Sequence, residues 1–296
     1  MTNNWIIKKQ NDEQHQIAQQ LAAELNISST LARLLVERDI TTVEEARRFF
    51  RPSLDDLHDP FLMTDMRKAV DRLTLAMRNN ERILIYGDYD VDGTTAVTLV
   101  YKSLIQIYAN LGFYIPNRYT EGYGISTTGI DYAADNGYTL VIALDCGIKA
   151  VEKIAYASSK GIDFIICDHH TPGSELPAAV AVLDPKRADC HYPYDELSGC
   201  GVGFKFMQAF ARDNSLDETK FLYPLLDLLA MSIASDIVPI TGENRVLAYH
   251  GLRQINRNPS TGVKSLLQVC GIEGHEVTIS DLVFKIGPRI NASGRM

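Results

Sequence analysis

Residues 81–94 read ERILIYGDYDVDGT. A short apolar run, 82–87, leads directly into three aspartates, Asp88, Asp90 and Asp92. Carboxylates this close repel one another, and folding alone does not compensate for that repulsion. The pattern therefore predicts a strand followed by a turn whose acidic side chains hold a cation.

The spacing of these aspartates also matches the start of a calcium-binding EF-hand loop. Two observations exclude that motif. The twelfth position counted from Asp88 is Leu99, where an EF-hand needs a bidentate glutamate. The preceding residues, 82–86, have the composition of a strand, whereas an EF-hand loop follows a helix. We therefore expect residues 88–93 to form the turn after a strand, at the sheet edge where α/β proteins bind ligands.

Apolar runs of strand length alternate with amphipathic segments from Arg82 onward. This alternation predicts an α/β fold, with a parallel sheet flanked by helices on both faces. Residues 1–65 carry apolar residues at helical spacing and are expected to form an N-terminal helical extension. Residues 66–296 are expected to form one domain that becomes mainly helical beyond Gly199. The expected N-caps in the extension are Ser28 or Ser29 and Thr41 or Thr42.

The expected strands are 82–87, 139–147, 163–170 and 180–185. The expected helices of the domain are 66–79, 94–108, 126–137, 150–161, 201–213, 219–236, 244–256 and 261–270. Acidic and histidine residues end two further strands: Asp145 ends one, and Asp168, His169 and His170 end the next. A single acid at such a place is more often a helix cap or a turn former. Three strands that end this way at one sheet edge favour a shared site.

Carboxylates together with imidazole suit Mn²⁺, with Mg²⁺ as the alternative and structural zinc disfavoured. A fourth acid, Asp236, ends an apolar helical run, and on its own it is better explained as a helix end. Several shared carboxylates and a histidine suggest two cations. Two ions ~3.5–4 Å apart can stabilise both the attacking and the leaving oxygen of a phosphoryl transfer. The sequence therefore predicts two-metal phosphoryl chemistry.

The composition is that of an ordinary globular protein: 296 residues, 46% hydrophobic and 22% charged, with a net charge of -8. This acidity counts against a nucleic-acid binder coated with lysine, although bound dications would offset part of it. No stretch approaches the ~20 apolar residues of a membrane helix. Residues 1–14 lack the apolar core of a secretory signal. Five cysteines without a CxxC pair favour buried thiols in a reducing cytoplasm.

Four motifs occur in order: GDYDVDGTTA (87–96), LDCG (144–147), CDHH (167–170) and ASDIVP (234–239). In this order they resemble the metal motifs of the DHH phosphoesterases. Other stretches resemble the RecJ group of that family, the bacterial single-strand-specific DNA exonucleases. The resemblance covers residues 51–296, and the ordered set is far more specific than any one motif. The RecJ-like stretches are LHDPFLMTDM (57–66), IPNRYTEGYG (115–124), LSGCGVGFK (197–205) and GPRINASGRM (287–296).

The resemblance implies a ligand set for two divalent cations. Asp145 would bridge the ions, and His170 would lie beside the scissile phosphate. Many members of the family carry a histidine four residues before the first ligand aspartate, but here that position is Tyr86, a poor ligand. Asp88 or water is therefore expected to complete the site served by Asp90. The implied ligands are Asp88, Asp90, Asp92, Asp145, His169 and Asp236, and the implied catalytic residues are Asp145, His169 and His170.

Residues of the RecJ-like stretches are candidates for substrate contact. Arg118 can pair with phosphate and Tyr123 can stack on a base, although a glycine-rich surface turn is the plain alternative. Residues 198–203 would start a helix whose N–H groups bind an anion, and a tightly packed helix explains them equally well. Arg289 and Asn291 can donate to phosphate oxygens, with a capped turn as the alternative. The candidates are Arg118, Tyr123, Gly124, Ser198, Gly199, Lys205, Arg289 and Asn291.

The resemblance implies a metal-dependent exonuclease that hydrolyses single-stranded DNA from its 5′ end to mononucleotides, in DNA repair and recombination. Single-stranded DNA would be the main partner, a single-strand-binding protein or a helicase would be further candidates, and no membrane partner is expected. Polarity and strand preference rest on the resemblance alone, because no residue spacing shows them.

Two rival functions stay open. A DHH phosphodiesterase for cyclic dinucleotides or short oligoribonucleotides would use the same metal chemistry, although the N-terminal extension speaks against it. The second rival is a weakly active or non-catalytic nucleic-acid-binding core. RecJ relatives carry a DHH-associated domain and an OB-fold after the segment that matches 287–296, and neither follows Met296.

Overall fold

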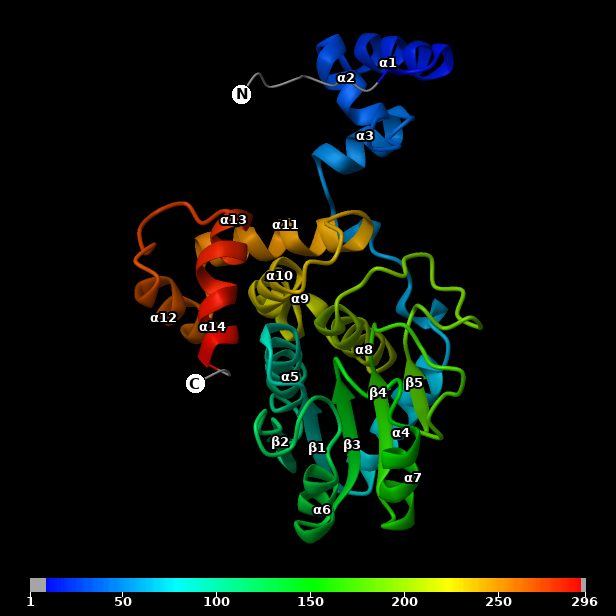
Figure 1. Cartoon of the computed structure of the whole chain (residues 1–296), viewed down its shortest axis with the longest axis vertical. Coiled ribbons are helices and arrows are strands. Elements are labelled where there is room, and N and C mark those ends of the chain that lie inside the picture. The colour runs from blue at the N-terminus through cyan, green and yellow to red at the C-terminus, as the bar shows by residue number, and fades with distance from the viewer. Residues whose placement is uncertain (1–8, 294–296) are drawn as a thin grey trace, which may run out of the picture. The chain divides into compact units, whose positions relative to one another are not determined.

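The computed structural model describes residues 9–293 and divides the chain into two compact units, with the division between Asp56 and Leu57 (Figure 1). The four ordered motifs all lie in the second unit. Within the described residues, no helix is both long and apolar enough to cross a membrane. The prediction about a secretory signal concerns residues 1–14, and of these 1–8 lie outside the described residues.

Among its described residues, 9–56, the first unit contains the α-helices α1 (Asp12–Leu25), α2 (Ser29–Val36) and α3 (Val43–Phe50). Side-chain caps fix where they begin. Ser28 caps α2 and Thr42 caps α3, so one alternative of each predicted N-cap is confirmed. The helices bury a small apolar core made of Ala18, Leu21, Ala32, Leu35, Val36 and Ala46.

A five-stranded sheet forms the centre of the second unit, and every neighbouring pair of strands is parallel (Figure 1). The strand order is β2-β1-β3-β4-β5, which confirms the predicted α/β fold. Only β2 was not among the expected strands, because this short edge strand is partly exposed and lacks a continuous apolar run. The strands are β1 (Arg82–Gly87), β2 (Leu111–Tyr114), β3 (Tyr138–Leu144), β4 (Asp163–Cys167) and β5 (Ala181–Leu183).

Helices cover both faces of the sheet, so alternate strand side chains enter two separate cores. Tyr86, Val141 and Phe164 face one layer of helices. Because the central strands are buried on both faces, their sequences are continuous apolar runs. One layer is α6 (Thr127–Asp135) and α7 (Val151–Ser159); the other is α4 (Met66–Arg78), α5 (Val91–Leu104) and α8 (Gly199–Asp213).

Beyond β5 the chain is mainly helical, as predicted. The segment 219–236, predicted as one helix, is interrupted at Pro224, because proline cannot donate the hydrogen bond of a helix interior. The later helices are α9 (Glu218–Phe221), α10 (Leu226–Ser235), α11 (Gly242–Arg257), α12 (Thr261–Val269), α13 (Ile279–Asp281), a π-helix (Leu282–Ile286) and α14 (Gly287–Ser293). Short 3-10 helices are Leu54–Asp56, Pro60–Leu62 and Tyr223–Leu225.

Helix α5 begins earlier than predicted. The expected turn at 88–93 ends at Asp90, whose side chain accepts a hydrogen bond from the Gly93 N–H and caps the helix. The helix therefore starts at Val91 rather than Thr94, and Asp92 lies inside its first turn.

Residues 57–65, which were predicted to belong to the N-terminal extension, pack with the second unit. Leu57 and Met63 are buried there. The His58 carbonyl accepts a hydrogen bond from Lys205 Nζ at 2.7 Å, and the His58 N–H donates to Glu243. These long-range contacts, which the local sequence does not reveal, place the segment against α8 and α11.

Helices α10 and α11 approach closely at Gly251. A Cβ added there would lie 2.1 Å from the Leu226 carbonyl oxygen and 2.7 Å from the Ala230 Cβ. We expect Gly251→Ala to lower the free energy of unfolding by about 1–3 kcal/mol in urea denaturation, because overpacking outweighs the helix propensity of alanine.

Gly262→Ala in α12 is the matched control, since an added Cβ there meets nothing within 4 Å. It should leave the free energy of unfolding unchanged or raise it by up to about 1 kcal/mol. Equal stability of the two variants would contradict the close packing at Gly251.

Candidate metal centre

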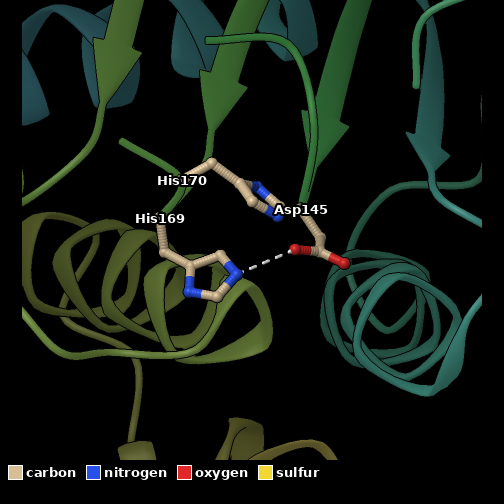
Figure 2. Close-up of side chains that lie close together, drawn as sticks. All are labelled: Asp145, His169 and His170. Carbon is tan, nitrogen blue, oxygen red and sulfur yellow. Dashed lines mark ion pairs between the residues drawn. The ribbon is translucent and has the colours of Figure 1, made fainter. Parts of the chain in front are cut away.

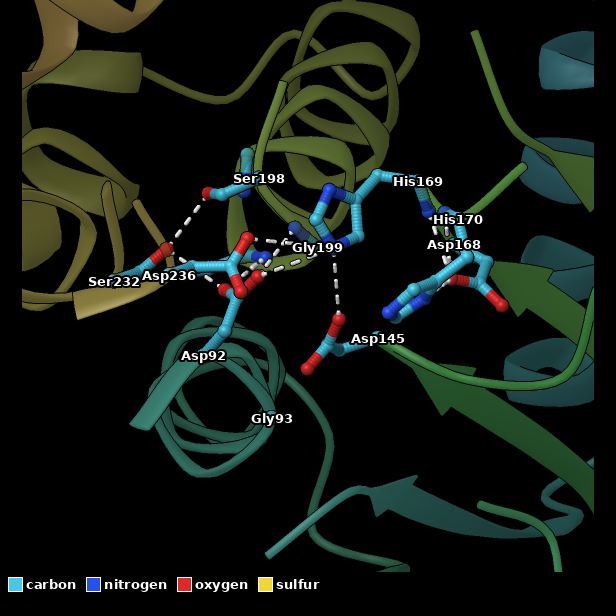
Figure 3. Close-up of polar contacts among 12 residues, drawn as sticks. Asp92, Gly93, Asp145, Asp168, His169, His170, Ser198, Gly199, Ser232 and Asp236 are labelled. Atoms are coloured by element: carbon cyan, nitrogen blue, oxygen red, sulfur yellow. Dashed lines mark hydrogen bonds and ion pairs between the residues drawn. The ribbon is translucent and has the colours of Figure 1, made fainter. Parts of the chain in front are cut away.

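His169 lies among three carboxylates at the carboxyl ends of the strands (Figure 3). Its Nε2 is 3.2 Å from Asp145 Oδ1, 3.5 Å from Asp236 Oδ2 and 3.7 Å from Asp92 Oδ2. His169 follows β4, Asp145 follows β3 and Asp236 follows α10. Asp92 belongs to the first turn of α5. The strand-end residues that the sequence analysis expected at one edge therefore do meet, and Asp236 joins them from a helix end.

Asp145 occupies an unusual backbone conformation directly after β3. Its φ of 58° is left-handed, which aspartate tolerates better than most residues. Helix α8 begins against it: a Cβ added at Gly199 would lie 2.6 Å from both the Cβ and Oδ1 of Asp145. Residue 199 must therefore be glycine for the helix to approach this closely.

Asp168 fixes the two histidines that follow it. Its Oδ1 accepts hydrogen bonds from the backbone N–H groups of His169 and His170 and lies 2.7 Å from His170 Nδ1. Its Oδ2 accepts from the Ile148 N–H at 2.9 Å. The hydrogen bond that His170 Nδ1 donates to Asp168 raises the pKa of His170. Both imidazole rings consequently point toward the Asp145 carboxylate (Figure 2).

Asp92 is held by the start of α8. Its two oxygens accept the backbone N–H groups of Gly199 at 2.7 Å and Cys200 at 2.8 Å, and Ser232 Oγ donates to Oδ1 at 2.7 Å (Figure 3). Ser198 caps the helix and bonds to Ser232 at 2.7 Å. The N-terminus of α8 thus binds an anion, as the sequence analysis allowed, but that anion is a carboxylate of the chain itself.

Burial governs protonation in this group. Removal from water raises the pKa of Asp92 and of Asp145 and lowers the pKa of His169. The pKa of Asp236 rises to about 7, first through burial and then through the charges of Asp92 and Asp90. A bound cation would favour the charged carboxylates and so act against these shifts.

The donor set fits a divalent cation. Among residues 9–293, neither ring nitrogen of His169 has a hydrogen-bond partner, and Asp145 Oδ1 and Asp88 Oδ2 are also buried without one. Such atoms are rare in folded proteins unless water or an ion satisfies them. Two ligand atoms about 2.1 Å from one ion and at right angles lie about 3 Å apart, close to the observed 3.2 Å between His169 and Asp145.

Two sets of ligand atoms each lie within 4.8 Å of one another: Asp92, His169 and Asp236, and Asp145, His169 and His170. All three residues of the first set are among the implied ligands. Asp88 and Asp90 belong to neither set, so the implied second site stays a prediction.

Asp88 and Asp90 nevertheless lie close to the centre. Asp90 caps α5, and its charge is among the causes that raise the pKa of Asp145 after burial. Asp88 is buried, and burial followed by the charge of Asp90 raises its pKa to about 6. The Gly124 N–H donates to Asp88 Oδ1 at 3.4 Å. The Tyr86 hydroxyl donates to the Gly124 carbonyl at 2.8 Å, which agrees with leaving Tyr86 out of the ligand set.

The candidates of the loop 115–124 lie beside the centre. Tyr123 is 56% exposed, and its hydroxyl is 3.2 Å from His170 Nε2 and 3.4 Å from the Asp145 carbonyl oxygen. The Arg118 guanidinium lies 4.9 Å from the centroid of the Tyr89 ring. Tyr123 therefore lies beside the centre, and Arg118 is exposed beside Tyr89.

Of the other candidates for substrate contact, Lys205 and Asn291 bond to other parts of the protein, and Arg289 lies in α14. Lys205 is fully buried, and its ammonium bonds to Glu243 at 3.1 Å, so it offers no surface to a phosphate. Asn291 Oδ1 accepts the Val91 N–H at 3.2 Å, at the start of α5. Arg289 donates to the Lys285 carbonyl within its own helical segment.

Two residues of the centre carry roles that the sequence analysis did not assign. Asp168 was noted as a strand-end acid, but its orientation of His170 depends on the backbone fold after β4. Ser232 lies in an apolar helical run and supports Asp92 from 140 residues away. Its only sequence signal is a hydroxyl within a buried helix, which is too common to single out.

The model of the DHH family, N-terminal domain, matches residues 82–233, more than half of the chain. The chain belongs to the DHH family. The matched residues include β1, all strand-end residues of the centre and Ser232, while Asp236 lies just beyond them.

Known RecJ proteins resemble this DHH chain. The single-stranded-DNA-specific exonuclease RecJ of Bacillus subtilis (strain 168) is 38% identical over 292 residues, covering 99% of this chain and 36% of that protein. A crystal structure of exonuclease RecJ bound to manganese has a TM-score of 0.72 at 30% identity, covering 82% of this chain and 60% of the other. RecJ of Thermus thermophilus in complex with Mn²⁺ has a TM-score of 0.79 at 25% identity, covering 95% and 39%.

This DHH chain is therefore a RecJ homologue that corresponds to the N-terminal and DHH portion of RecJ. It spans only 36% of the length of the Bacillus subtilis protein. The family resemblance seen in the motifs is confirmed.

The contact between Gly199 and Asp145 leads to a test by metal binding. Gly199→Ala should weaken Mn²⁺ binding about 10- to 100-fold in isothermal titration calorimetry, because the new methyl group displaces the Asp145 carboxylate. Gly201→Ala in the same helix is the control, since its added Cβ would make ordinary contacts of 3.4 Å. Equal Mn²⁺ affinities would contradict the assignment of Asp145 as a ligand.

Because the pKa values of Asp88 and Asp236 are raised, the stabilisation of the protein by Mn²⁺ should depend on pH. In the metal-free protein the folded state keeps Asp88 and Asp236 protonated above the ordinary pKa of aspartate. The stability that these protonated carboxyl groups contribute is lost as the pH rises through about 6 to 7. Mn²⁺ must displace the same protons. The rise in melting temperature on adding Mn²⁺ should therefore be larger at pH 8 than at pH 6 in differential scanning fluorimetry, whereas a larger rise at pH 6 would contradict the shifts.

Proposed function

We propose that this chain is the catalytic core of a metal-dependent exonuclease that hydrolyses single-stranded DNA from the 5′ end to mononucleotides. The observation that carries the proposal is the group of Asp92, Asp145 and Asp236 around His169, whose orphaned atoms and spacing fit a dication. The substrate and polarity are those of the RecJ proteins that the chain resembles, one of which is described as single-stranded-DNA-specific.

The proposed centre holds two divalent cations, Mn²⁺ before Mg²⁺, which would activate water and stabilise charge on the phosphate. Two solved relatives were bound to manganese, and a related structure of RecJ from Thermus thermophilus contained Mg²⁺. Asp92, Asp145, His169 and Asp236 would hold the cations together with Asp90 and Asp88.

The chain's own residues would orient the substrate. The Nε2 atom of His170 lies on the exposed side of the centre, beside Tyr123. The raised pKa of His170 favours the protonated imidazole, whose positive charge would neutralise a phosphate oxygen. Tyr123 would stack on a base or sugar, and Arg118 would pair with a phosphate. Arg289 would add a further phosphate contact, while Lys205 is omitted because it is buried.

A role in DNA repair and recombination in the cytoplasm, with a single-strand-binding protein or a helicase as partner, belongs to the same proposal. It rests on the RecJ resemblance, and the five free cysteines agree with a reducing compartment. The chain matches only part of RecJ, so hydrolysis by this core on its own is the point to test first.

Asp145→Asn should reduce hydrolysis of a 3′-labelled single-stranded oligonucleotide in Mn²⁺ by about a hundredfold or more, because the substituted side chain loses the charge that holds the cations. Asparagine also tolerates the left-handed backbone at this position, so the fold should persist. The wild-type products should shorten from the 5′ end and disappear with chelator.

Asp135→Asn, an exposed acid at the end of α6, is the matched control and should keep the wild-type rate. Wild-type turnover in Asp145→Asn would contradict the proposed centre. Cleavage of dinucleotides without cleavage of the long strand would establish the phosphodiesterase alternative instead. If neither substrate is cleaved by the wild type, the proposal that this core is catalytic fails.

A further inference from the structure

The loop between β2 and α6 reaches three residues of the metal centre. Tyr123 OH is 3.2 Å from His170 Nε2 and 3.4 Å from the Asp145 carbonyl oxygen. One residue further on, the Gly124 N–H points to Asp88 Oδ1 at 3.4 Å. The loop joins β2 to α6 and contains no regular helix or strand of its own (Figure 1). Its conformation therefore depends on side-chain contacts.

Glu121 supplies the first set of those contacts. Its Oε1 accepts the Asn117 N–H at 2.7 Å, and its Oε2 accepts the hydroxyls of Ser126 at 2.5 Å and Tyr114 at 2.9 Å. Tyr114 ends β2 just before the loop, Asn117 lies near the start of the loop, and Ser126 is its last residue. Burial alone would raise the pKa of Glu121, but these hydrogen bonds outweigh it and hold the pKa below its ordinary value. The side chain is thus a charged acceptor that joins both ends of the loop.

Tyr86 supplies the second set from the end of β1. Its hydroxyl donates to the Gly124 carbonyl at 2.8 Å and accepts the Ser126 N–H at 3.1 Å. The ring is 1% exposed, so neither bond can be exchanged readily for water. Gly124 lies between this hydroxyl and Asp88, with a left-handed φ of 79° that favours glycine.

Packing links the two sets of contacts. The rings of Tyr86 and Tyr114 stack with centroids 5.4 Å apart. A Cβ added at Gly129 would lie 2.7 Å from Tyr86 Cε2 and 3.2 Å from Tyr114 Cε1, so glycine lets both rings approach the start of α6. The hydroxyls of the stacked rings then hold the loop at two different points, Tyr86 at Gly124 and Tyr114 through Glu121.

We propose that Glu121 and Tyr86 are positioning residues for the exonuclease reaction, which clamp the loop 115–126 so that Tyr123 and Arg118 face the substrate beside His170. The clamp touches neither the substrate nor the cations. It holds substrate-binding side chains in place before the strand arrives, which lowers the ordering cost of binding. This inference rests on the proposed function.

The test compares Glu121→Gln and Tyr86→Phe with Glu152→Gln, an exposed glutamate on α7. Glutamine would replace one of the two acceptor oxygens with an amide donor, against at least one of the three donors of the clamp, and phenylalanine would leave the Ser126 N–H buried without its acceptor. In both variants, amides of residues 117–126 should exchange with deuterium about tenfold faster or more, because a charge-assisted or buried hydrogen bond is lost. Glu152→Gln should match the wild type.

If Glu121 and Tyr86 only position the loop, their substitution should weaken binding of the substrate but not binding of the metal. KM for the single-stranded oligonucleotide should rise about tenfold in both clamp variants, with a change in kcat of less than about threefold, since the lost order affects binding of the strand. Mn²⁺ affinity in calorimetry should stay within about twofold of wild type, because neither residue is a ligand.

Unchanged amide exchange in both clamp variants would overturn the inference, as would faster exchange without a rise in KM. A loss of Mn²⁺ binding in step with activity would also overturn it, because the residues would then act on the metal centre. If the wild type hydrolyses no oligonucleotide, the proposed function fails, and the exchange and Mn²⁺ measurements still decide whether the clamp exists.

Discussion

Electrostatic repulsion among buried carboxylates is the constraint on which the rest of this structure depends. Asp92 and Asp145 are buried beside His169 and Asp236 is half-buried, and the pKa of each is raised because burial and like charges disfavour ionisation. A protein that only needed to fold would place apolar groups there. The arrangement is stable in its charged form only when a cation compensates it, which is why function and fold cannot be separated at this edge of the sheet.

The fold meets this constraint with backbone groups. The N-terminus of α8 directs two N–H groups at Asp92, and Asp168 gathers backbone N–H groups from its own turn and from Ile148. These fixed dipoles hold the carboxylates in place without adding mobile positive side chains that would compete with a metal. Glycine at 199 brings α8 within contact of Asp145, so the supporting helix and the acid it supports are packed as one unit.

Much of this was predictable from sequence because strong local signals coincide. The apolar run 82–87 predicted the strand, and parallel order placed Asp145 and His169 at the same edge of the sheet. Other features depend on distant partners. Lys205 was expected near substrate, yet Glu243 and the His58 carbonyl bury it. Neither partner is close to Lys205 in the chain.

Ser198 and Gly199 show a different limit of sequence analysis. The helix start rich in small residues was predicted to bind a substrate anion, but in the structure its N–H groups bind the Asp92 carboxylate, and sequence cannot tell a ligand from a side chain of the same protein. Tyr86 and Glu121 show the same limit for loops. Their importance comes from hydrogen bonds that close only when β1, the loop and α6 are assembled. Local patterns therefore indicated the strand-end acids of the candidate metal centre, but not the groups that position them.

On this proposal, the carboxylates around His169 bind divalent cations. The most direct measurement is an anomalous difference map from crystals of the wild-type chain grown with MnCl₂ and recorded at the manganese absorption edge. A peak within about 2.5 Å of Asp92, Asp145, His169 and Asp236 oxygen or nitrogen atoms is the predicted result. An empty centre in a map that shows manganese bound elsewhere on the same chain would contradict it.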